Sequence, residues 1–501
     1  MHYGRKRAII IASIIIGVLL ILGIGGTILY LKTDIFKSNQ SLFFKYIEQA
    51  AKGIEYTPNA NMTNNINRIK EEPFTLAGNL SYETDEKNNP TKNALKNMKF
   101  VVEAKVDNSA KKAYGIGTLK SNNQDLFKLE YANTDNIYAL KSDEVVTAFI
   151  GVENQNLKVL AQKLGITNTS NIPNSVAPIL NLCETLNLTE DEKSHIYETY
   201  MPVLEQNIEK SNFTKNKDIA ISRDGVVYNT TGYRLELSAS ELKQIEIKLL
   251  QALKEDSITL NLITTKAKTF NLEEKYTQIN TLVQEIDSLI NKINKESTNS
   301  QDGIIITVYV ENGKVVTTEI IYKNEVKYTI YGQKENNANS YYILIENLST
   351  TEEYNKIEIK TEETSSNNSS TLSVLININN KKGIEVYLEN ANDNEEDTFK
   401  TNCEVTINEE DNKNSILSYE QEIAFKESIT DIVKIDRNNC AVLNDYPTEQ
   451  LQVLVKSLVQ RVQELINQKA QAVGIPLNIN VQGNADTTDS TENSVDNNTQ
   501  E

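Results

Sequence analysis

The sequence predicts an α+β fold, in which an N-terminal transmembrane helix precedes a large antiparallel meander sheet, or sheets, covered by amphipathic helices. Three observations support this prediction. A run of 24 uncharged residues follows a short basic stub. Segments that alternate apolar and polar residues, separated by turn residues, recur over 74–146 and 303–437. Segments with apolar residues three or four positions apart lie before, between and after them.

These patterns divide the chain into six consecutive parts. They are a cytoplasmic stub at 1–7, a transmembrane helix at 8–31, a juxtamembrane helix and loop at 32–73, a first β-rich and helical unit at 74–265, a second helix-plus-meander unit with a C-terminal helix at 266–477, and a disordered acidic tail at 478–501. Both large units have strands that lead into a capped amphipathic helix. A diverged duplication and one large sheet with helices on its apolar face both fit this pattern, and the sequence leaves the two open.

The apolar run in RKRAIIIASIIIGVLLILGIGGTILYLK has the length of a membrane anchor. A helix of its 24 residues would be about 36 Å long, enough to cross the hydrocarbon core of a bilayer. A secretory signal peptide has a shorter apolar core followed by small residues at its cleavage site, whereas Tyr30 and Leu31 occupy that place here. We therefore expect an uncleaved anchor that contacts the lipid bilayer through residues 8–31. Because basic residues stay in the cytoplasm, residues 32–501 are expected outside the cell membrane.

The charge of the chain excludes two classes of partner. After Arg7 the chain has 48 basic and 69 acidic residues, a net charge of −21. This negative field would repel a phosphate backbone, so we expect no nucleic-acid binding. The same field disfavours docking of the body of the protein on anionic lipid.

The segment after the apolar run predicts a helix and then a loop. Ser38 is a plausible N-cap for NQSLFFKYIEQAAKGI, whose apolar residues recur with helical spacing. The polar stretch TPNANMTNNINR is expected to be a loop. From Phe74 to about Val146 apolar and polar residues alternate with a period of two, as in KFVVEAKV. This indicates an antiparallel meander with one solvent-exposed face.

Helices are expected over about 155–211 and again after Leu237. Pro202 interrupts the first of these stretches, which predicts a kink or two helices. Ser238 and Glu241 fit a capping box at the start of the second.

Two further helices are expected near and after the second meander. Residues 271–296 carry apolar residues at alternating spacings of three and four, which fits a helix lying on its own sheet better than a coiled-coil partner site. Strands dominate over 303–437. The helix after Pro447 is expected to bury a stripe made of Leu451, Leu454, Val455, Leu458, Val462 and Leu465.

Few residues in the sequence are candidates for chemistry. His195 is expected on a solvated helix face, paired with Asp191 and Glu198 at helical spacing, rather than to act as a catalytic base. GIGTLK at 115–120 lacks the later glycine and the strand-to-helix context of a phosphate loop, which predicts glycines in a strand.

The remaining candidates concern metal ions and thiols. The acidic stretch ENANDNEED offers Asp393, Glu395 and Asp397 as calcium ligands but lacks the EF-hand spacing, so a solvated hairpin loop is favoured. Cys403 and Cys440 both lie in the C-terminal β-rich region and could form a disulfide, which the spacing does not establish. We therefore assign no catalytic, cofactor-binding or metal residue and expect no cofactor and no enzymatic activity.

Two resemblances add to these expectations. The basic stub, the anchor and TDIFKSNQSLFFKYIEQ resemble uncharacterised single-pass anchored proteins of Gram-positive bacteria, which have long β-rich ectodomains. The meander with capped helices resembles, in architecture alone, the half-barrel of lipoprotein carriers of the LolA and LppX type. The expected function is an extracytoplasmic binding module, with an apolar ligand between sheet and helices, and the alternative is a cell-envelope scaffold that contacts an envelope protein.

Overall fold

The computed structural model describes most of the chain between Ser38 and Ile475. The described residues are 38–54, 60–86, 89–167, 169, 172, 174–176, 188–270, 274–295, 303–334, 337–348, 356–366, 368–408 and 414–475. The expected stub, transmembrane helix and acidic tail lie outside these residues. Within them, none of the helices is long and apolar enough to cross a membrane.

The described strands form one 18-stranded sheet. They are β1 Phe74–Thr84, β2 Met98–Asp107, β3 Lys112–Ser121, β4 Gln124–Thr134, β5 Ile137–Ser142, β6 Val146–Glu153, β7 Phe213–Arg223, β8 Val226–Leu237, β9 Ile304–Glu311, β10 Lys314–Tyr322, β11 Val326–Lys334, β12 Ala338–Asn347, β13 Lys356–Ser365, β14 Ser369–Ile378, β15 Lys381–Asp393, β16 Thr398–Asn408, β17 Asn414–Phe425 and β18 Cys440–Val442. The expectation of an α+β fold with a large antiparallel sheet is therefore confirmed.

The helices form between the groups of strands. They are α2 Asn39–Ile54, α3 Ala60–Glu71, α4 Pro90–Lys96, α5 Leu157–Lys163, α7 Glu190–Asn207, α8 Ala239–Glu255, α9 Ser257–Thr269, α10 Glu274–Thr277, α11 Ile279–Lys295 and α12 Thr448–Ala472. The predicted helix after Ser38, the helical stretches after 155 and 237, and the C-terminal helix are thus present.

The strands are neighbours in the order β7 to β17, then β1 to β6, and finally β18. Neighbours pair antiparallel throughout, except for the parallel pair of β6 and β18. β1 joins the early and late strands because it pairs with β2 on one side and β17 on the other. Of the two alternatives left open by the sequence, the described strands therefore adopt one large sheet.

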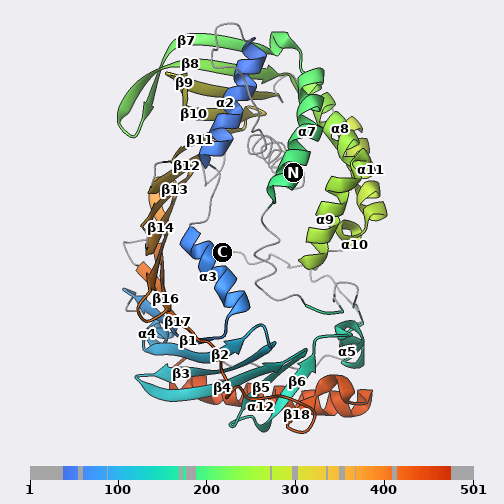
Figure 1. The fold of residues 1–501 in the computed structure, drawn as a ribbon, viewed down its shortest axis with the longest axis vertical. Helices are drawn as coiled ribbons and strands as arrows, with labels where there is room; N and C mark the ends of the chain where they lie inside the picture. The colour runs from blue at the N-terminus through green and yellow to red at the C-terminus, as the bar shows by residue number, and fades with distance from the viewer. Residues whose placement is uncertain are drawn as a thin grey trace, which may run out of the picture.

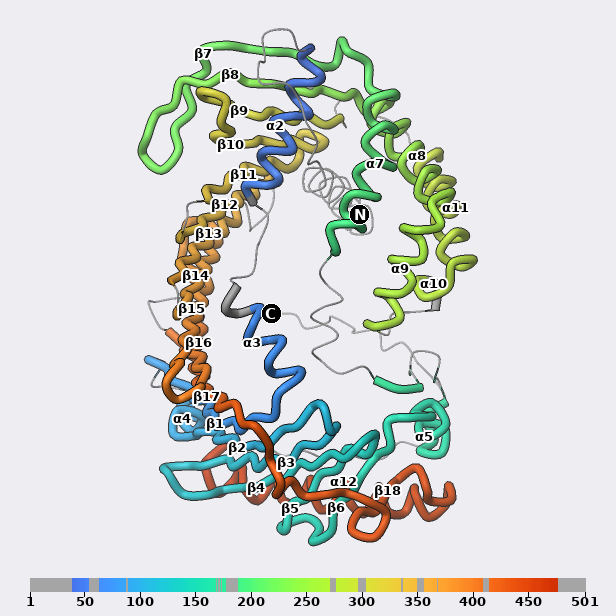
Figure 2. Tube along the Cα trace, in the orientation of Figure 1, coloured from blue at the N-terminus to red at the C-terminus, as the bar shows by residue number. Residues whose placement is uncertain are grey.

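The sheet curves, and helices α2, α3 and α7–α11 lie within the curve or across its open side, whereas α12 lies beneath β4–β6 at the bottom of the view (Figure 1). Strands β7–β10 lie at the top of the view, β12–β16 on the left, and β2–β6 at the bottom. Helices α2 and α3 lie inside the curve, and α7–α11 face it from the right (Figure 2). The side of the sheet that faces α2 is called the concave face below.

Short turns explain why consecutive strands become hairpin partners. Type I′ turns need positive φ at both central residues, which asparagine, aspartate and glycine adopt most easily. Such pairs occupy four of the described hairpins, namely Asn122–Asn123, Asp224–Gly225, Asn312–Gly313 and Asn379–Asn380. Part of the asparagine in this chain is therefore used for turn geometry.

Helix α2 fixes the upper part of the fold. Ser38 caps it, since its Oγ accepts a hydrogen bond from the Ser41 amide at 3.1 Å. Phe43, 0 % exposed, packs with Phe213 at a ring-centroid distance of 5.4 Å, and Tyr46 packs on Tyr233 at 4.9 Å. The apolar side of α2 is thus buried on the concave face of β7–β11.

The polar stretch at 57–68 was expected to be a loop, and this expectation is wrong for its described part, which belongs to α3. Tertiary contacts stabilise this helix despite its asparagines. Arg68 binds Asp397 through two hydrogen bonds of 2.7 and 2.8 Å and stacks over the Phe425 ring at 3.7 Å. Asn65 donates to Asn392 at 2.7 Å. These partners are more than 300 residues away in sequence, so local propensity does not reveal them.

Three other helical expectations need correction. Helix α7 runs through Pro202 as one element, so the alternative of two helices is not what forms. Within the described part of 271–296, the helix is divided into α10 and α11, and α11 packs on α8 and α9 rather than on the sheet, through Leu282 and Ile286. In α12, Leu451 is 0 % exposed but Val462 is 40 % exposed, so the predicted stripe is buried only in part.

Candidate functional site

The concave face of the central strands carries aligned rows of apolar side chains. Ile330 belongs to the core beneath α2, and the strand register places five further isoleucines opposite one another across the next strands. We call this set the isoleucine row, and its members are Ile330, Ile343, Ile359, Ile376, Ile384 and Ile407. At the usual distance of about 4.8 Å between strands, five intervals make it about 24 Å long.

Two parallel rows widen this apolar surface. In the first, Val374, Val386 and Val405 lie opposite one another and lead to Leu417. In the second, the register aligns Leu372, Leu388, Cys403, Tyr419 and Leu80. The alternation seen in the sequence therefore builds a continuous apolar face only because the register brings the same face of each strand together.

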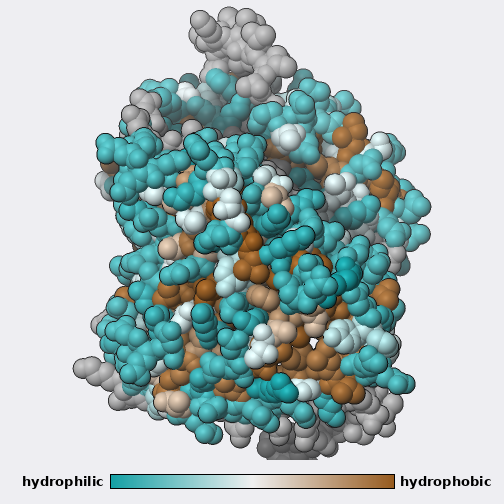
Figure 3. All heavy atoms as spheres, turned by 60° about the horizontal axis from the view of Figure 1, so that its bottom comes forward, coloured by the Kyte–Doolittle hydropathy of each residue, from teal (hydrophilic) through white to brown (hydrophobic). Residues whose placement is uncertain are grey.

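This surface is incompletely covered. Ile330 is 8 % exposed under α2, whereas Ile407 is 47 % exposed and Leu417 is 42 % exposed. Further along the same face, Leu140 of β5 is 49 % exposed. In the space-filling view, apolar side chains are exposed in patches over the middle and lower part of the visible face, among hydrophilic side chains (Figure 3). Large apolar surfaces of this kind commonly mark binding sites.

The opposite face of the same strands is polar. Tyr342 donates to Glu358 at 2.9 Å, and Asn377 donates to the other Glu358 oxygen at 2.6 Å. Burial raises the pKa of Glu358, but the hydrogen bonds from Asn377 and Tyr342 and the nearby Lys360 outweigh it, so that pKa lies below its ordinary value. The two faces therefore differ in chemistry, and the apolar one is the candidate binding surface.

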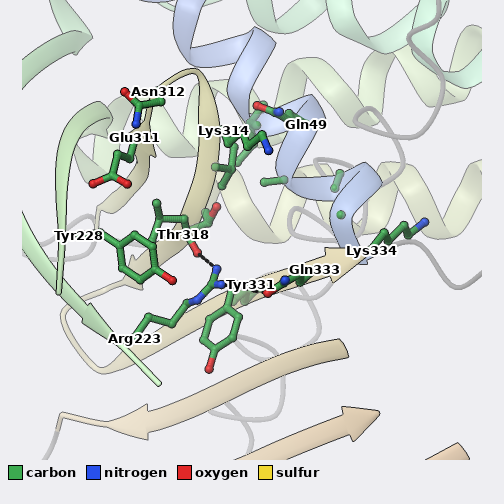
Figure 4. A pocket seen from close by; sticks show the side chains of 18 of the residues that line it. Gln49, Arg223, Tyr228, Glu311, Asn312, Lys314, Thr318, Tyr331, Gln333 and Lys334 are labelled. Carbon is green, nitrogen blue, oxygen red and sulfur yellow. Dashed lines mark hydrogen bonds between the residues drawn. The ribbon is translucent and has the colours of Figure 1, made fainter. Parts of the chain in front are cut away.

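A pocket of about 710 Å³ opens at the β11 end of the isoleucine row. Its apolar lining comes from α2 and from the concave face, including Ile47, Ile320 and Ile330. Its polar lining comes from the β7–β8 and β9–β10 hairpins, from β11, and from Gln49 and Thr318 (Figure 4). The volume lies within the range of about 300–1,000 Å³ that is usual for small-molecule sites.

Arg223 organises the polar side of this pocket. Its Nη1 donates to the Val316 carbonyl at 2.9 Å, and its Nη2 donates to the Gln333 side chain at 3.2 Å. The guanidinium lies 4.8 Å from the Tyr331 ring centroid and 5.3 Å from that of Tyr228. These contacts tie the β7–β8 hairpin to β10 and β11 and hold the guanidinium at the pocket wall (Figure 4).

Some polar groups around Arg223 have hydrogen-bond partners, and others have none among the described residues. Tyr331 donates to Asp224 at 2.9 Å, and burial followed by this hydrogen bond raises the pKa of Tyr331 well above its ordinary value. Asp224 also lies 3.5 Å from Arg223 Nε, which has no hydrogen-bond partner among the described residues. Thr318 lines the pocket, is 4 % exposed, and its Oγ1 has no hydrogen-bond partner within the described part of the chain.

The structure places His195 with a different acid from the two expected. Its Nε2 lies 3.0 Å from both carboxylate oxygens of Asp256, the N-cap of α9. Tyr200 and Thr259 also donate to Asp256 Oδ2, at 3.1 and 2.5 Å. The predicted partners Asp191 and Glu198 are exposed on α7. The cluster therefore joins α7 to the junction of α8 and α9.

Of the acidic stretch at 389–397, which was expected to be a solvated hairpin loop, residues 389–393 end β15 and only the remainder is the exposed turn into β16. Asp393 accepts hydrogen bonds from the amides of Glu395 and Glu396, and Asp397 is paired with Arg68. Among the described residues, no group of acidic, histidine and cysteine side chains is placed to hold a metal ion.

The other residues singled out in the sequence are the glycines of GIGTLK and two cysteines. The glycines of GIGTLK lie in β3, as expected, and a Cβ on Gly117 would come within 2.7 Å of the Phe100 ring. Cys403 and Cys440 are both free thiols, so the disulfide that the sequence left open does not form. Cys440 is 6 % exposed, and burial raises the pKa of its thiol.

Sequence reasoning did not identify the pocket residues. Arg223 and Thr318 are distant in sequence and lie in strands without any motif, and only the pairing of β8 with β9 and of β9 with β10 brings them together. In the sequence, the isoleucines could be recognised only as part of the apolar–polar alternation within each separate strand. Their alignment into one row depends on register, which a single sequence does not specify.

The fold and site define an α+β protein in which one curved sheet presents a partly covered apolar face and an adjoining pocket with apolar and polar lining. The chain belongs to a family of unknown function, DUF6583, whose family model matches residues 1–474. No curated protein matches the chain.

The chain also has similarities to solved structures. One, described as "Asymmetric conductivity of engineered proteins", has 6 % identity and a TM-score of 0.19, with 71 % of this chain and 99 % of that chain covered. Two others are mutants of the Rh. blastica porin, a triple and a double mutant, with 6 and 7 % identity, TM-scores of 0.18 and the same coverage. TM-scores this low support no argument about fold or function.

Proposed function

We propose that the chain is a non-enzymatic, single-pass membrane-anchored protein of the cell envelope whose extracytoplasmic sheet binds an apolar ligand on its concave face. The observation that carries the proposal is the isoleucine row with its two neighbouring rows, which remain partly exposed in the described structure. Burying this surface against an acyl chain would be favourable by roughly 25 cal/mol per Å² of apolar area. A row about 24 Å long suits an extended acyl chain better than a compact apolar molecule.

The proposed location rests on the sequence. Residues 8–31 are long enough to span a bilayer, and the basic residues before them favour a cytoplasmic N-terminus. The resemblance of the juxtamembrane stretch to anchored proteins of Gram-positive bacteria supports the same location. In this arrangement the bilayer that holds the anchor is also a nearby source of acyl chains.

Photocrosslinking of the full chain tests the binding proposal. The protein is held in uncharged phosphatidylcholine nanodiscs with a monoacylglycerol that carries a diazirine in its acyl chain, and labelled peptides are mapped by mass spectrometry. We expect labelling of β12–β16 in addition to the anchor. Ile407→Lys places a charge on the concave face at a position already 47 % exposed, and should reduce labelling of these strands by at least half.

The matched control is Val227→Lys, in the β7–β8 hairpin, where the native side chain is 71 % exposed and is not part of the rows. It should leave labelling unchanged. Labelling confined to the anchor, or equal labelling of wild type and Ile407→Lys, would contradict the proposal.

An assembly partner in the envelope is a second candidate, favoured by α12. Its Val453 is 71 % exposed, and Val459, Val462 and Ile466 are each 38–40 % exposed. Crosslinking in cells distinguishes this function. A protein that is captured by wild type and lost with Val453→Lys, while acyl-chain labelling is unchanged, would favour assembly over ligand binding.

A further inference from the structure

The pocket at the end of the isoleucine row has a charge opposite to that of the chain as a whole. Its charged lining residues are Arg223, Lys314, Lys334 and Glu311, three basic and one acidic, whereas the full chain carries −18. Glu311 accepts a hydrogen bond from the Asn229 amide at 2.8 Å. The local surplus of positive charge favours an anion.

The two lysines are available for a ligand. Lys314 begins β10 and Lys334 ends β11, both are exposed, and neither has an ion-pair partner among the described residues. Helix α2 ends beside the pocket with a partial negative charge of about half a unit, which is smaller than the lysine charges that face the same space. A bound anion would therefore meet a net positive environment.

Thr318 is a second feature of the pocket that indicates a ligand. Its side chain is 4 % exposed, it lines the pocket, and its Oγ1 is without a hydrogen-bond partner among the described residues. A buried hydroxyl usually has a partner, and its absence calls for an explanation. A ligand oxygen in the pocket would accept this hydrogen bond.

The pocket and the isoleucine row adjoin at Ile330. Ile330 lines the pocket and is also the first member of the row. Thr318 lies directly opposite Ile330 on the same face. A molecule with one polar and one apolar end could therefore place the first in the pocket and the second along the row.

We propose that the pocket binds the anionic head group, carboxylate or phosphate, of a single-chain amphipathic lipid whose acyl chain lies along the isoleucine row. This inference rests on the proposed function and specifies its ligand class. Lys314 and Lys334 attract the head group, Thr318 donates a hydrogen bond to it, and Arg223, whose charge is offset by Asp224, holds the pocket wall in place.

The test compares head groups on the same acyl chain. Full-length protein in phosphatidylcholine nanodiscs is crosslinked with three diazirine probes: a fatty acid, a lysophosphatidate and the uncharged monoacylglycerol. We expect the anionic probes to label the peptides that contain Ile330 about fivefold more than the monoacylglycerol does. The fatty acid and the lysophosphatidate distinguish a carboxylate ligand from a phosphate ligand.

Two variants test the residues. Lys314→Glu reverses one charge at an exposed position and should reduce labelling by the anionic probe about five- to tenfold, with monoacylglycerol labelling unchanged. Thr318→Val removes an unpaired hydroxyl, so it should leave the unfolding temperature the same or higher while reducing anionic labelling about threefold.

The matched control for the second variant is Thr317→Val. Thr317 is 3 % exposed, lies on the opposite face, and donates to the Ile330 carbonyl at 3.3 Å. It should lower the unfolding temperature without changing the preference between head groups.

The outcomes separate the two proposals. Equal labelling by all three probes, unaffected by Lys314→Glu, would overturn the anionic pocket and leave acyl-chain binding standing. No labelling of β12–β16 by any probe would overturn the proposed function itself. Loss of anionic labelling in Thr317→Val as large as in Thr318→Val would overturn the role of the Thr318 hydroxyl.

Discussion

Replacement of Asp256 tests whether the polar cluster between α7 and α9 holds these helices together. Asp256 is 9 % exposed and accepts hydrogen bonds from the amides of Ile258 and Thr259, both at 3.1 Å. It also accepts from the hydroxyls of Tyr200 and Thr259 and contacts His195. Removing this carboxylate leaves several buried donors without an acceptor.

The expected cost of Asp256→Ala follows from these contacts. Loss of a helix N-cap costs about 1 kcal/mol. Tyr200 and Thr259, 6 and 7 % exposed, would each be left with an unpaired hydroxyl at about 1 kcal/mol or more. The total is about 3 kcal/mol. Since unfolding entropy is about 2.1 cal/mol/K per residue, a 501-residue chain should lose about 3 °C in its unfolding temperature.

The same carboxylate predicts a dependence on pH. Burial raises the pKa of Asp256, but hydrogen bonds from Thr259 and the contact with His195 outweigh it, so the folded pKa lies below the ordinary value. Its ionised form therefore stabilises the fold at pH values above about 4, and this contribution is lost as the pH falls through the folded pKa. The difference in stability between wild type and Asp256→Asn should be largest near pH 7 and should shrink as the pH falls below about 4, the ordinary pKa of an aspartate.

Thermal unfolding followed by far-ultraviolet circular dichroism measures these changes, because the chain has no tryptophan for fluorescence. The control variants are Asp191→Asn and Glu198→Gln, which remove the exposed acids on the same helix as His195 and should each cost less than about 0.5 kcal/mol. A shift for these variants as large as that for Asp256→Ala would refute the reasoning. So would a wild-type advantage over Asp256→Asn that does not change between pH 7 and pH 3.

Two further predictions concern the core and the thiols. Phe43→Ala should destabilise the fold by about 3–5 kcal/mol because the side chain is 0 % exposed. Gln49→Ala, on the exposed side of α2, should cost less than about 0.5 kcal/mol. Similar unfolding temperatures for the two variants would contradict the packing of α2. In a Cys183→Ser background, iodoacetamide should modify Cys403 before Cys440, because Cys440 is buried and burial raises its pKa; equal rates, or a disulfide on non-reducing gels, would count against the described positions of the thiols.

Local patterns in the sequence were sufficient to predict most elements. The capping box of Ser238 and Glu241 forms, with the Ser238 Oγ accepting from the Glu241 amide and the Glu241 carboxylate accepting from the Ser238 amide. Ser38 caps α2, and alternation located the strands of both meanders. These features depend on residues within one turn or one strand of each other, which a single sequence contains.

Features that depend on distant residues were missed. Helical spacing suggested Asp191 and Glu198 as neighbours of His195, but its partner Asp256 is 61 residues away. The asparagine-rich α3 has a weak intrinsic preference for helix and depends on Asp397 and Phe425. The candidate site was missed for the same reason, since the pocket and the isoleucine row exist only after distant strands have paired.

The pairing of β1 with β17 has a consequence for how the chain folds. Phe74 lies opposite Phe425, so one edge of β1 remains unpaired until about 350 further residues have been made. Contacts of such large sequence separation slow folding, and a strand with an open edge can pair with the wrong chain while it waits. We therefore expect that a fragment ending before β17 will aggregate rather than form a stable half, and that the strands complete their sheet only after the C-terminal part has emerged.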